Sequence, residues 1–468
     1  MNKFYTLVLT VSLLFASNDS KAQIPPALDT ELRQTLDSMR TVLGAKSLSA
    51  AIQTSGGSIW AHANGVSAGS PLTNTTVNDA FLIGSVTKTI TSACILQLAD
   101  AGILHLDDSL HEWLPAMPYI NPNITIRQLL NHTSGIYDVL SHPHNQDSLI
   151  ADMSRIWTPE ELIAAFIAPP VFQPGTSWSY CNTNYFLLGM IIREATGNEF
   201  YTELRNRFYT PLALNSFAIP AFEPLNSPVA HLWLDITGDG VQDDAHDFYM
   251  NYLSLNSTAG AAGGYFSTPT DCTKWMRSYM RGDLLSPELM AEAKTTVPAG
   301  STIERYGLGL MHKTSGFLGY EAYGHGGDLA YHASSWYFPE LDQSITVFTN
   351  DNTETSWTLL PVVRELLRTY ITNQTASVDE SVLEECRISP IPFDDQLVVS
   401  WKNTSQSTDF TLELQDAAGR SIAVQREHSF SANRFESRFE ELGTLPAGIY
   451  FVSISGNNAQ LKTIKVMK

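Results

Sequence analysis

A serine and a lysine stand three residues apart between Phe81 and Thr89, where an apolar stretch meets a predicted helix over 89–101. Residues at this spacing share one face of a helix, so the Ser85 hydroxyl and the Lys88 amine are expected to meet. A serine hydroxyl becomes an effective nucleophile only when a base takes its proton. A lysine can be that base where burial lowers its pKa. By itself the pair is a short pattern, which an N-cap serine followed by a solvated lysine would also produce.

Two later segments carry residues that could complete such a site. Tyr180 and Asn182 stand in a polar loop before an apolar helix predicted to begin near Tyr185. A tyrosine hydroxyl can relay protons, and an asparagine amide can hold both the lysine and a substrate carbonyl. The third segment, Tyr323-Gly324-His325-Gly326-Gly327-Asp328, precedes a predicted strand over 331–338. Its glycines would let a substrate backbone lie close against a strand edge.

The elements that would position these residues form one large domain, predicted over 25–372. Strands are predicted over Ala50–Gln53 and Ser344–Thr349, near the two ends of this domain, with helices between them. This order predicts a mixed α/β fold in which both ends of the domain contribute to one sheet. Thr158, followed by a proline and two glutamates, is typical of a helix N-terminus.

Taken together, the three segments resemble the serine β-lactamase and D-Ala-D-Ala peptidase superfamily, in particular the branch of class C β-lactamases, D,D-carboxypeptidases, D-aminopeptidases and related esterases. The resemblance covers about 32–370. It also rests on the flanking segments Ile126-Arg127-Gln128-Leu129-Leu130-Asn131-His132-Thr133-Ser134-Gly135, Gly263-Gly264-Tyr265-Phe266-Ser267-Thr268 and Tyr306-Gly307-Leu308-Gly309-Leu310. It implies an α/β fold with a β-lactamase-like antiparallel sheet flanked by helices, and an all-helical subdomain roughly between Leu104 and Leu214.

The resemblance also implies a role for each candidate residue. Ser85 would be the acylated nucleophile, and Lys88 and Tyr180 would share the general-base and general-acid roles. The backbone N–H groups of Ser85 and Asp328 would form the oxyanion hole. The residues implied in substrate binding are Asn182, His325, Gly327 and Asp328. No cofactor is implied.

The third segment departs from the superfamily pattern at His325, where many relatives have a lysine. A histidine gives less fixed positive charge for a substrate carboxylate, although it can be protonated near neutrality. Asp328 adds a negative charge beside it. Both residues favour a D-amino-acid peptide, of the D,D-carboxypeptidase or D-aminopeptidase type, or a small ester. A true β-lactamase and a non-catalytic penicillin-binding-like protein are the alternatives.

A separate acidic segment resembles a calcium loop. Oxygen ligands stand at alternate positions, with Gly240 at the sixth. The twelfth position is His246, where a bidentate glutamate is expected, so a solvated acidic turn is the favoured interpretation. The possible calcium ligands are Asp235, Thr237, Asp239 and Asp243.

Both ends of the chain indicate export. Residues 1–22 contain a positive Lys3, a short apolar stretch and small residues before the expected cleavage point, which is typical of a signal peptide. A polar linker is predicted over 373–387, and short alternating strands over 388–468 predict an all-β sandwich.

The C-terminal unit resembles the type A sorting domain of the type IX secretion system of Bacteroidota. The segments that carry this resemblance are Pro390-Ile391-Pro392-Phe393, Leu445-Pro446-Ala447-Gly448-Ile449-Tyr450-Phe451 and the basic end Lys462-Thr463-Ile464-Lys465-Val466-Met467-Lys468. A carbohydrate-binding or adhesive sandwich is the alternative. The resemblance implies a secreted or cell-surface protein and the type IX secretion machinery as a partner.

The composition argues against several other classes of partner. A formal net charge of -20 over 468 residues argues against nucleic acid and against a polybasic membrane contact. No stretch after the signal peptide is long and apolar enough for a transmembrane segment. The four cysteines show no disulfide scaffold and are expected to be mostly buried thiols. The resemblance to the superfamily implies a small-molecule or peptide substrate as the ligand.

Overall fold

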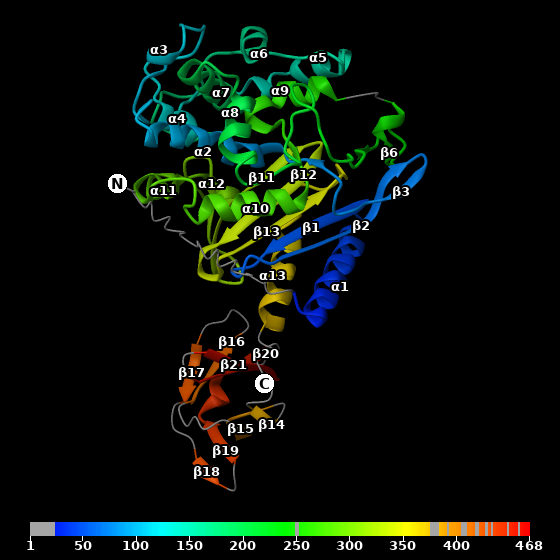
Figure 1. Ribbon diagram of the computed structural model, residues 1–468, viewed down its shortest axis with the longest axis vertical. Helices are drawn as coiled ribbons and strands as arrows, with labels where there is room; N and C mark the ends of the chain where they lie inside the picture. Colours follow the sequence, from blue (N-terminus) through cyan, green and yellow to red (C-terminus); the bar gives the residue numbers. More distant parts are fainter. Residues whose placement is uncertain are drawn as a thin grey trace, which may run out of the picture.

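The computed structural model describes residues 24–248, 252–374, 383–390 and 393–403, together with 410–416, 421–425, 429–431, 434–446, 449–456 and 459–468. The expected signal peptide, residues 1–22, lies outside the described residues. The rest forms a large α/β unit that ends with helix α13 and a smaller β unit (Figure 1). No described helix is both long and apolar enough to cross a bilayer.

An antiparallel sheet of nine strands forms the centre of the large unit. Its order is β3-β2-β1-β13-β12-β11-β10-β9-β8. The strands are β1 (Ser47–Gln53), β2 (Ile59–Gly69), β3 (Leu72–Asn74), β8 (Val297–Pro298), β9 (Arg305–Tyr306), β10 (Met311–Phe317), β11 (Tyr320–Leu329), β12 (Tyr331–Phe338) and β13 (Gln343–Thr349). Ala50 of β1 lies opposite Val347 of β13, so both ends of the domain contribute to one sheet, as predicted.

Helices cover both faces of this sheet. Helices α1 (Pro26–Leu43) and α13 (Leu360–Gln374) pack side by side on one face, where Val347 points (Figure 1). The next residue, Phe348, points to the other face, which α2 (Thr87–Asp100) and α10 (Pro269–Met280) cover. Helix α1 directs three leucines, spaced four residues apart, onto the sheet: Leu28, Leu32 and Leu36.

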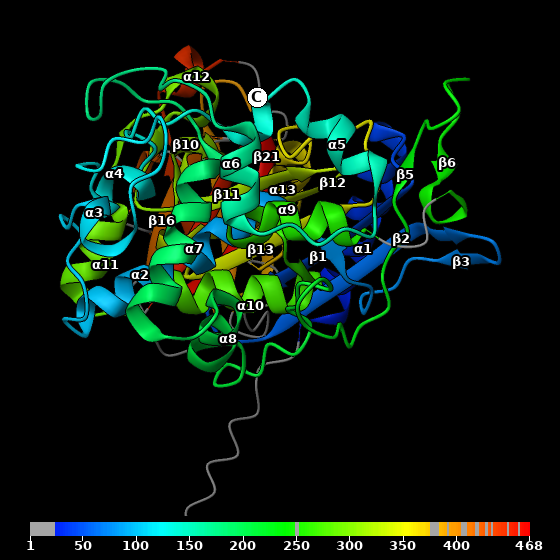
Figure 2. The same cartoon turned by 90° about the horizontal axis from the view of Figure 1, so that it is seen from above.

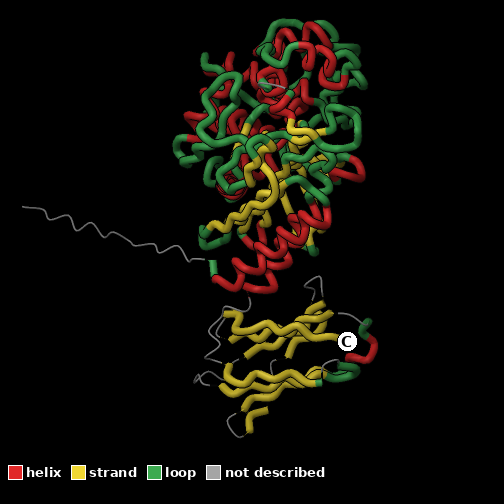
Figure 3. The backbone as a smooth tube through the Cα atoms, turned by 90° about the vertical axis from the view of Figure 1, so that its right-hand side faces the viewer, coloured by secondary structure: helices red, strands yellow, loops and turns green. Residues whose placement is uncertain are grey.

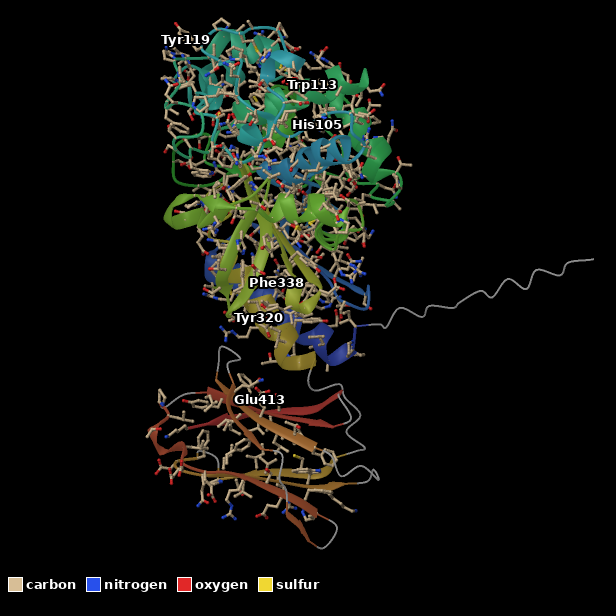
Figure 4. The ribbon with its side chains drawn as sticks, turned by 90° about the vertical axis from the view of Figure 1, so that its left-hand side faces the viewer. His105, Trp113, Tyr119, Tyr320, Phe338 and Glu413 are labelled. Carbon is tan, nitrogen blue, oxygen red and sulfur yellow. The ribbon has the colours of Figure 1, made fainter. Side chains whose placement is uncertain are left out.

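An all-helical subdomain lies beyond α2, within the limits that the resemblance implied (Figure 2). Its helices are α3 (Leu110–Trp113), α4 (Ile126–Leu130), α5 (Asn145–Ala151), α6 (Pro159–Phe166), α7 (Asn182–Thr196) and α8 (Phe200–Leu204). Helix α6 begins as predicted, because the Thr158 hydroxyl accepts a hydrogen bond from the Glu161 N–H in a capping box. Figure 4 shows Trp113 in this subdomain and Tyr320 at the opposite end of the sheet.

The large unit also contains shorter strands and helices. These are β4 (Phe81–Leu82), β5 (Trp233–Leu234), β6 (Asp243–Asp244), β7 (Phe266–Ser267), α9 (Leu253–Gly263), α11 (Pro287–Lys294) and α12 (Gly300–Ile303). Helix α2 packs against α7, α9 and β11, so nearly all of its residues are buried. The segment that carries Ser85 and Lys88 is therefore held between the sheet and the helical subdomain.

The C-terminal unit consists of two four-stranded antiparallel sheets, visible as two layers in Figure 3. The strands are β14 (Leu383–Ser389), β15 (Leu397–Asn403), β18 (Ser429–Ser431) and β19 (Arg434–Phe439) in one sheet, and β16 (Phe410–Asp416), β17 (Ser421–Gln425), β20 (Ile449–Gly456) and β21 (Ala459–Met467) in the other. Aromatic rings fill the space between the sheets, where Trp401 stacks on Phe435 at 5.4 Å between centroids.

This unit begins earlier than the sequence indicates. The expected linker covers 373–387, yet residues from Leu383 pair with β15 in strand β14. Helix α13 ends at Gln374, and residues 375–382 lie outside the described residues.

Candidate active site

Ser85 lies in a 3-10 turn, η1 (Gly84–Val86), that joins β4 to α2 and packs on β11. Gly84 has a left-handed φ of 51°, and a Cβ there would lie 2.9 Å from the backbone nitrogen of Asp328. A Cβ on Gly327 would lie 2.0 Å from the Ile83 carbonyl oxygen and 3.1 Å from the Ser85 nitrogen. Only glycine permits either approach. The close packing brings the backbone N–H groups of Ser85 and Asp328 together.

The Lys88 amine is buried in the first turn of α2 and contacts three oxygens. Its Nζ lies 3.0 Å from Ser85 Oγ, 2.8 Å from Asn182 Oδ1 and 2.8 Å from the Ala262 carbonyl oxygen. The amide and carbonyl oxygens can only accept hydrogen bonds, so they fix two N–H groups of the amine. The third position on the nitrogen therefore faces the Ser85 hydroxyl.

Burial lowers the pKa of Lys88 to about 7, although the charge of Asp138 acts in the opposite direction. An amine with this pKa is neutral in about half of the molecules at pH 7. A neutral amine keeps its two N–H groups on Asn182 and Ala262 and turns its lone pair toward Ser85. Position and protonation state therefore both suit a base that accepts the Ser85 proton.

Asn182 is the first residue of α7, which begins slightly before the expected start near Tyr185 because Cys181 already has the extended backbone of an N-cap. The Asn182 amide joins two charged groups: Oδ1 accepts from Lys88, and Nδ2 donates to Asp138 Oδ2 at 2.8 Å. Burial raises the pKa of Asp138, and hydrogen bonds to its carboxylate act against that rise. This bridge fixes the orientation of the amide.

The Tyr180 hydroxyl is buried beside Ser85, and it has no well-oriented hydrogen-bond partner among the described residues. Burial raises the pKa of Tyr180 well above 10, and the Ser85 hydroxyl acts in the opposite direction. The ring packs on buried His132, at 4.4 Å between centroids. His132 Nδ1 accepts the Cys181 N–H at 3.2 Å, and burial lowers the His132 pKa well below 6.5. Tyr180 is therefore a neutral phenol supported by a neutral imidazole.

His325 is completely buried, and its neighbours fix its tautomer. Nδ1–H donates to the Gly326 carbonyl at 2.5 Å, and the Tyr306 hydroxyl donates to Nε2 at 2.9 Å. Burial lowers the pKa of His325 to about 3, and Lys88 acts in the same direction. The expectation that His325 can be protonated near neutrality is wrong, because burial removes the water that would stabilise an imidazolium.

The Asp328 carboxylate is exposed at one edge and bonded to the protein at the other. It accepts hydrogen bonds from the Ser356 N–H and the Ser356 hydroxyl, each at 2.6 Å, and His332 Nδ1 lies 2.6 Å from it. Burial favours the neutral acid, but hydrogen bonds from His332 and Ser356 hold the pKa of Asp328 below its usual range. The carboxylate is therefore charged and ties the Ser356 segment to β11.

A cavity of about 240 Å³ opens over Ser85. Strand β11 pairs with β12 as far as Leu329 but with β10 only as far as Gly324, so its later residues present a strand edge here, as the glycines suggested. The lining residues are Gly84, Ser85, Leu140, Tyr180, Asn182, Ala259, Ala262, Gly263, Ile303, Met311, Gly326, Asp328, Leu329, Ser356 and Trp357. Lys88, His325 and Gly327 are not among them and lie behind this surface. Of the lining residues, Asp328 alone carries a formal charge.

The acidic loop predicted as a possible calcium site is held by its own backbone. Asp235 accepts hydrogen bonds from the N–H groups of residues 238–240 at 2.7 to 3.1 Å. Asp243 Oδ2 accepts the N–H and the hydroxyl of Thr237, at 3.0 and 3.2 Å. Asp235, Asp239 and Asp243 do not belong to the one described group whose ligand atoms converge. The contacts therefore support the acidic-turn interpretation.

The converging group consists of His231, Asp244 and His246, none of which the sequence assigned to a metal. Asp244 accepts the N–H groups of Gly69 and His246 and contacts His231 Nδ1. The two imidazoles stack with their centroids 3.7 Å apart and their planes at 9°. This arrangement is a hydrogen-bonded cluster that joins β6 to the end of β2.

Several residues of the site carried no signal as single residues. Ala262 acts through its carbonyl and Asp138 through the Asn182 amide. His132 and Tyr306 belong to the flanking segments of the resemblance, which could have pointed to them. Trp357, which lines the cavity, lies in a segment without a recognisable pattern.

The comparisons with known proteins agree with this geometry. The family described as beta-lactamase matches residues 32–366, and the secretion system C-terminal sorting domain matches residues 387–468. Penicillin-binding protein 4* of Bacillus subtilis (strain 168) is 27% identical over 257 residues, covering 51% of this chain and 53% of that protein. The chain thus spans about half the length of the curated relatives it matches.

Solved structures extend the likeness over the whole large unit. A D-stereospecific amidohydrolase from Streptomyces sp. is 30% identical, with a TM-score of 0.60, over 69% of this chain and 94% of that one. The D-amino acid amidase of Ochrobactrum anthropi SV3 shares the fold at 24% identity, with a TM-score of 0.65, over 74% of this chain and 99% of that one. This chain belongs to the beta-lactamase family over residues 32–366, and residues 387–468 form a secretion-system sorting domain.

Proposed function

We propose that this protein is an acyl-enzyme hydrolase that cleaves amides or esters of D-amino acids, with Ser85 as nucleophile and Lys88 as base. The contact of 3.0 Å between Ser85 Oγ and the buried Lys88 amine carries the proposal, because the amine has a pKa of about 7. A base with this pKa is neutral in about half of the molecules at pH 7 and can accept the serine proton while the bond from Oγ to the carbonyl carbon forms.

In the first step, Ser85 Oγ attacks the substrate carbonyl carbon, and its proton passes to the neutral Lys88 amine. The carbonyl oxygen becomes an oxyanion, which the N–H groups of Ser85 and Asp328 stabilise. The packing of η1 on β11 supports this role, since it sets the two N–H groups in place before substrate arrives. Asn182 holds Lys88 from the other side and can also bind a substrate amide.

In the second step, the intermediate collapses and the leaving amine takes a proton from Tyr180. This phenol is suited to donate because burial raises its pKa well above 10 and keeps it neutral. The proton on Lys88 then passes to the Tyr180 phenolate, so that Lys88 is again a neutral amine and Tyr180 a neutral phenol. Water then attacks the carbonyl carbon of the Ser85 ester, and its proton passes to the neutral Lys88 amine. As the ester bond breaks, the Lys88 ammonium returns a proton to Ser85 Oγ.

The charges at the cavity favour an aminopeptidase or amidase over a D,D-carboxypeptidase. Among the described residues that line the cavity there is no cation to receive a substrate carboxylate, and His325 is buried and neutral. A substrate ammonium would instead find the charged Asp328. The likeness to the D-stereospecific amidohydrolase and the D-amino acid amidase points to the same class. A β-lactam carries a carboxylate and is disfavoured for the same reason.

One set of substrates tests this proposal. The mature protein and a Ser85→Ala control are incubated with a fluorophosphonate probe, D- and L-phenylalanine amide, a D-Ala-D-Ala peptide and a chromogenic cephalosporin. We expect labelling that is absent in the control, and release of ammonia from the D-amide only. Turnover of the cephalosporin alone would favour the β-lactamase alternative. Absence of labelling would favour the non-catalytic alternative and contradict the proposal.

We further propose that residues 1–22 are a signal peptide and that residues 388–468 direct the protein through the type IX secretion system. The match of residues 387–468 to a secretion sorting domain supports this route to the medium or the cell surface. Fractionation of cells that express the chain with and without residues 388–468 tests it. Retention of the shortened chain inside the cell is the expected result.

A further inference from the structure

One wall of the cavity is apolar and comes from segments far apart in the sequence. Ile303 ends the short helix α12, Met311 begins β10, and Trp357 precedes α13; all three line the cavity. Ile303 and Trp357 are partly buried, with one side packed against the core beneath the sheet. A ligand can therefore cover the remaining apolar surface of both side chains.

Lys313 connects the two segments from behind the wall. Its side chain is 8% exposed and does not reach the cavity lining. Nζ donates to the Thr302 carbonyl at 2.6 Å and pairs with Glu304 at 3.3 Å, so it holds both residues that flank Ile303. The same ammonium lies 5.4 Å from the centroid of the Trp357 ring, within the range of a cation–π contact.

The conformation next to Ile303 depends on this contact. Glu304 has a left-handed φ of 71°, which is costly for a residue with a Cβ. Its carboxylate is held on one oxygen by Lys313 and on the other by the Thr314 N–H at 3.2 Å. Such strain persists only where the surroundings over-determine it. Lys313 therefore stabilises the turn that presents Ile303.

The Trp357 side of the wall has its own support. Ser356 donates two hydrogen bonds to Asp328, and it lies so close to Gly326 that a Cβ there would be 2.6 Å from its hydroxyl. The Ser356 backbone is thus anchored to β11, beside the N–H of Asp328. These hydrogen bonds do not hold the ring of Trp357. The charged group that lies over this ring is the Lys313 ammonium.

We propose that Lys313 is a positioning residue that fixes Ile303 and Trp357 as the wall for a bulky apolar side chain next to the scissile carbonyl. This inference rests on the proposed acyl-enzyme function. Burying an ammonium costs free energy unless it is fully paired. The partners of Lys313 lie in the two segments that form this wall: Thr302 and Glu304 flank Ile303, and the third partner is the ring of Trp357. The substrate class it selects is an amide or ester of a D-amino acid with an aromatic or large aliphatic side chain.

The test compares two fluorophosphonate probes whose phosphorus carries either a methyl or a benzyl group. In both reactions Ser85 Oγ forms the bond to phosphorus, fluoride leaves and the hydroxyl proton passes to Lys88, so the probes differ only in the group that meets the wall. Second-order labelling rates are measured for the full mature chain and for Lys313→Met, Lys313→Arg and Lys274→Met. Lys274 pairs with Asp271 on α10, which does not line the cavity.

We expect Lys313→Met to lower the benzyl-to-methyl rate ratio about tenfold. Lys313→Arg should restore most of the ratio because it keeps the cation, and Lys274→Met should not change it. The same change is expected in the ratio of kcat/KM for D-phenylalanine amide to D-alanine amide. If Lys313→Met does not fold, Trp357→Ala and Ile303→Ala provide the same comparison, since their side chains form the wall itself.

Two results would overturn the inference without affecting the proposed function. One is a ratio in Lys313→Met equal to that of the unaltered chain, while Ser85 is still labelled. The other is an equal loss of both rates in Lys313→Met, which is what a structural defect alone would cause. Absence of labelling in the unaltered chain is a different outcome, which would overturn the acyl-enzyme proposal and this inference with it.

Discussion

The replacement Asp138→Asn should make Lys88 a weaker proton acceptor while keeping the hydrogen bond from Asn182. It removes the hydrogen bond that Asp138 Oδ1 accepts from the Leu140 N–H, because the new amide nitrogen cannot accept. The new amide oxygen can still accept the N–H of Asn182, so the chain from Asn182 to Lys88 stays intact. The change removes a negative charge that raises the pKa of Lys88 against the effect of burial. The pKa of Lys88 should therefore fall below its present value of about 7.

The size of this change follows from the geometry. Two hydrogen bonds of 2.8 Å join the charges through the Asn182 amide. This path puts them about 7 Å apart, where two unit charges interact by about 2 kcal/mol at an effective dielectric of about 20. One pH unit corresponds to about 1.4 kcal/mol, so the pKa of Lys88 should fall by about one to two units.

The assay is the rate of fluorophosphonate labelling of Ser85 between pH 5 and pH 9. For a base with a pKa of about 7, the neutral fraction is about one tenth at pH 6 and about nine tenths at pH 8. The unaltered protein should thus gain about tenfold over this interval, and Asp138→Asn should reach its plateau about one to two units earlier. Asp107→Asn, which breaks an exposed pair with Arg127, is the control. An unmoved or upward-shifted midpoint in Asp138→Asn would show that Lys88 is not the titrating base.

Three other changes separate the parts of the site. Tyr180→Phe should slow amide hydrolysis about 10²- to 10³-fold but affect an activated ester much less, because that leaving group needs no proton; equal losses in kcat would contradict a proton-donor role. Gly327→Ala should lower the melting temperature and abolish labelling, because the new Cβ would lie 2.0 Å from the Ile83 carbonyl oxygen. Normal labelling would show that η1 does not need this contact. Trp401→Ala should destabilise the C-terminal sandwich by about 3–5 kcal/mol and leave Ser85 labelling unchanged; calorimetry on the full chain can resolve the two units.

Local pattern was enough to predict much of the fold and the centre of the site. Strand-like stretches over Ala50–Gln53 and Ser344–Thr349 marked β1 and β13, and their positions at the two ends of the domain implied one sheet. A threonine, a proline and two glutamates marked the start of α6. Ser85 and Lys88 could be paired because three residues is less than one turn of helix. These inferences need only distances along the chain.

The remaining features depend on contacts between distant segments. The sequence shows Gly327 as one glycine of several, and its function follows from the approach of Ile83, far earlier in the chain. Ala262 holds Lys88 by its backbone carbonyl, for which its residue type gives no signal. The sequence left open whether His325 is protonated near neutrality, because its burial depends on distant segments. In the structure Gly326 and Tyr306 occupy both ring nitrogens, and burial keeps the ring neutral.

The last prediction concerns how the hydrolysis rate depends on pH, through Lys88 and Asp328. The base must be neutral, which requires a pH above about 7, whereas a D-amino acid amide is attracted to Asp328 only while its α-ammonium is protonated. An α-amino group has a pKa of about 7.7–8.0. Hydrolysis of D-phenylalanine amide should therefore give a narrow bell-shaped kcat/KM profile with a maximum between pH 7 and 8.

The matched substrate for this prediction is an ester of the N-acetylated amino acid, which has no amine to titrate. Its rate should rise through the same acidic midpoint, set by Lys88, and then stay level. Asp328→Asn should reduce kcat/KM for the amide several-fold and change the ester much less, because the ester makes no ion pair with the carboxylate. Two results would mean that Asp328 does not recognise an ammonium and serves only to anchor Ser356 beside the oxyanion hole. One is a kcat/KM that stays level at alkaline pH for both substrates, and the other is an equal loss of kcat/KM for both substrates in Asp328→Asn.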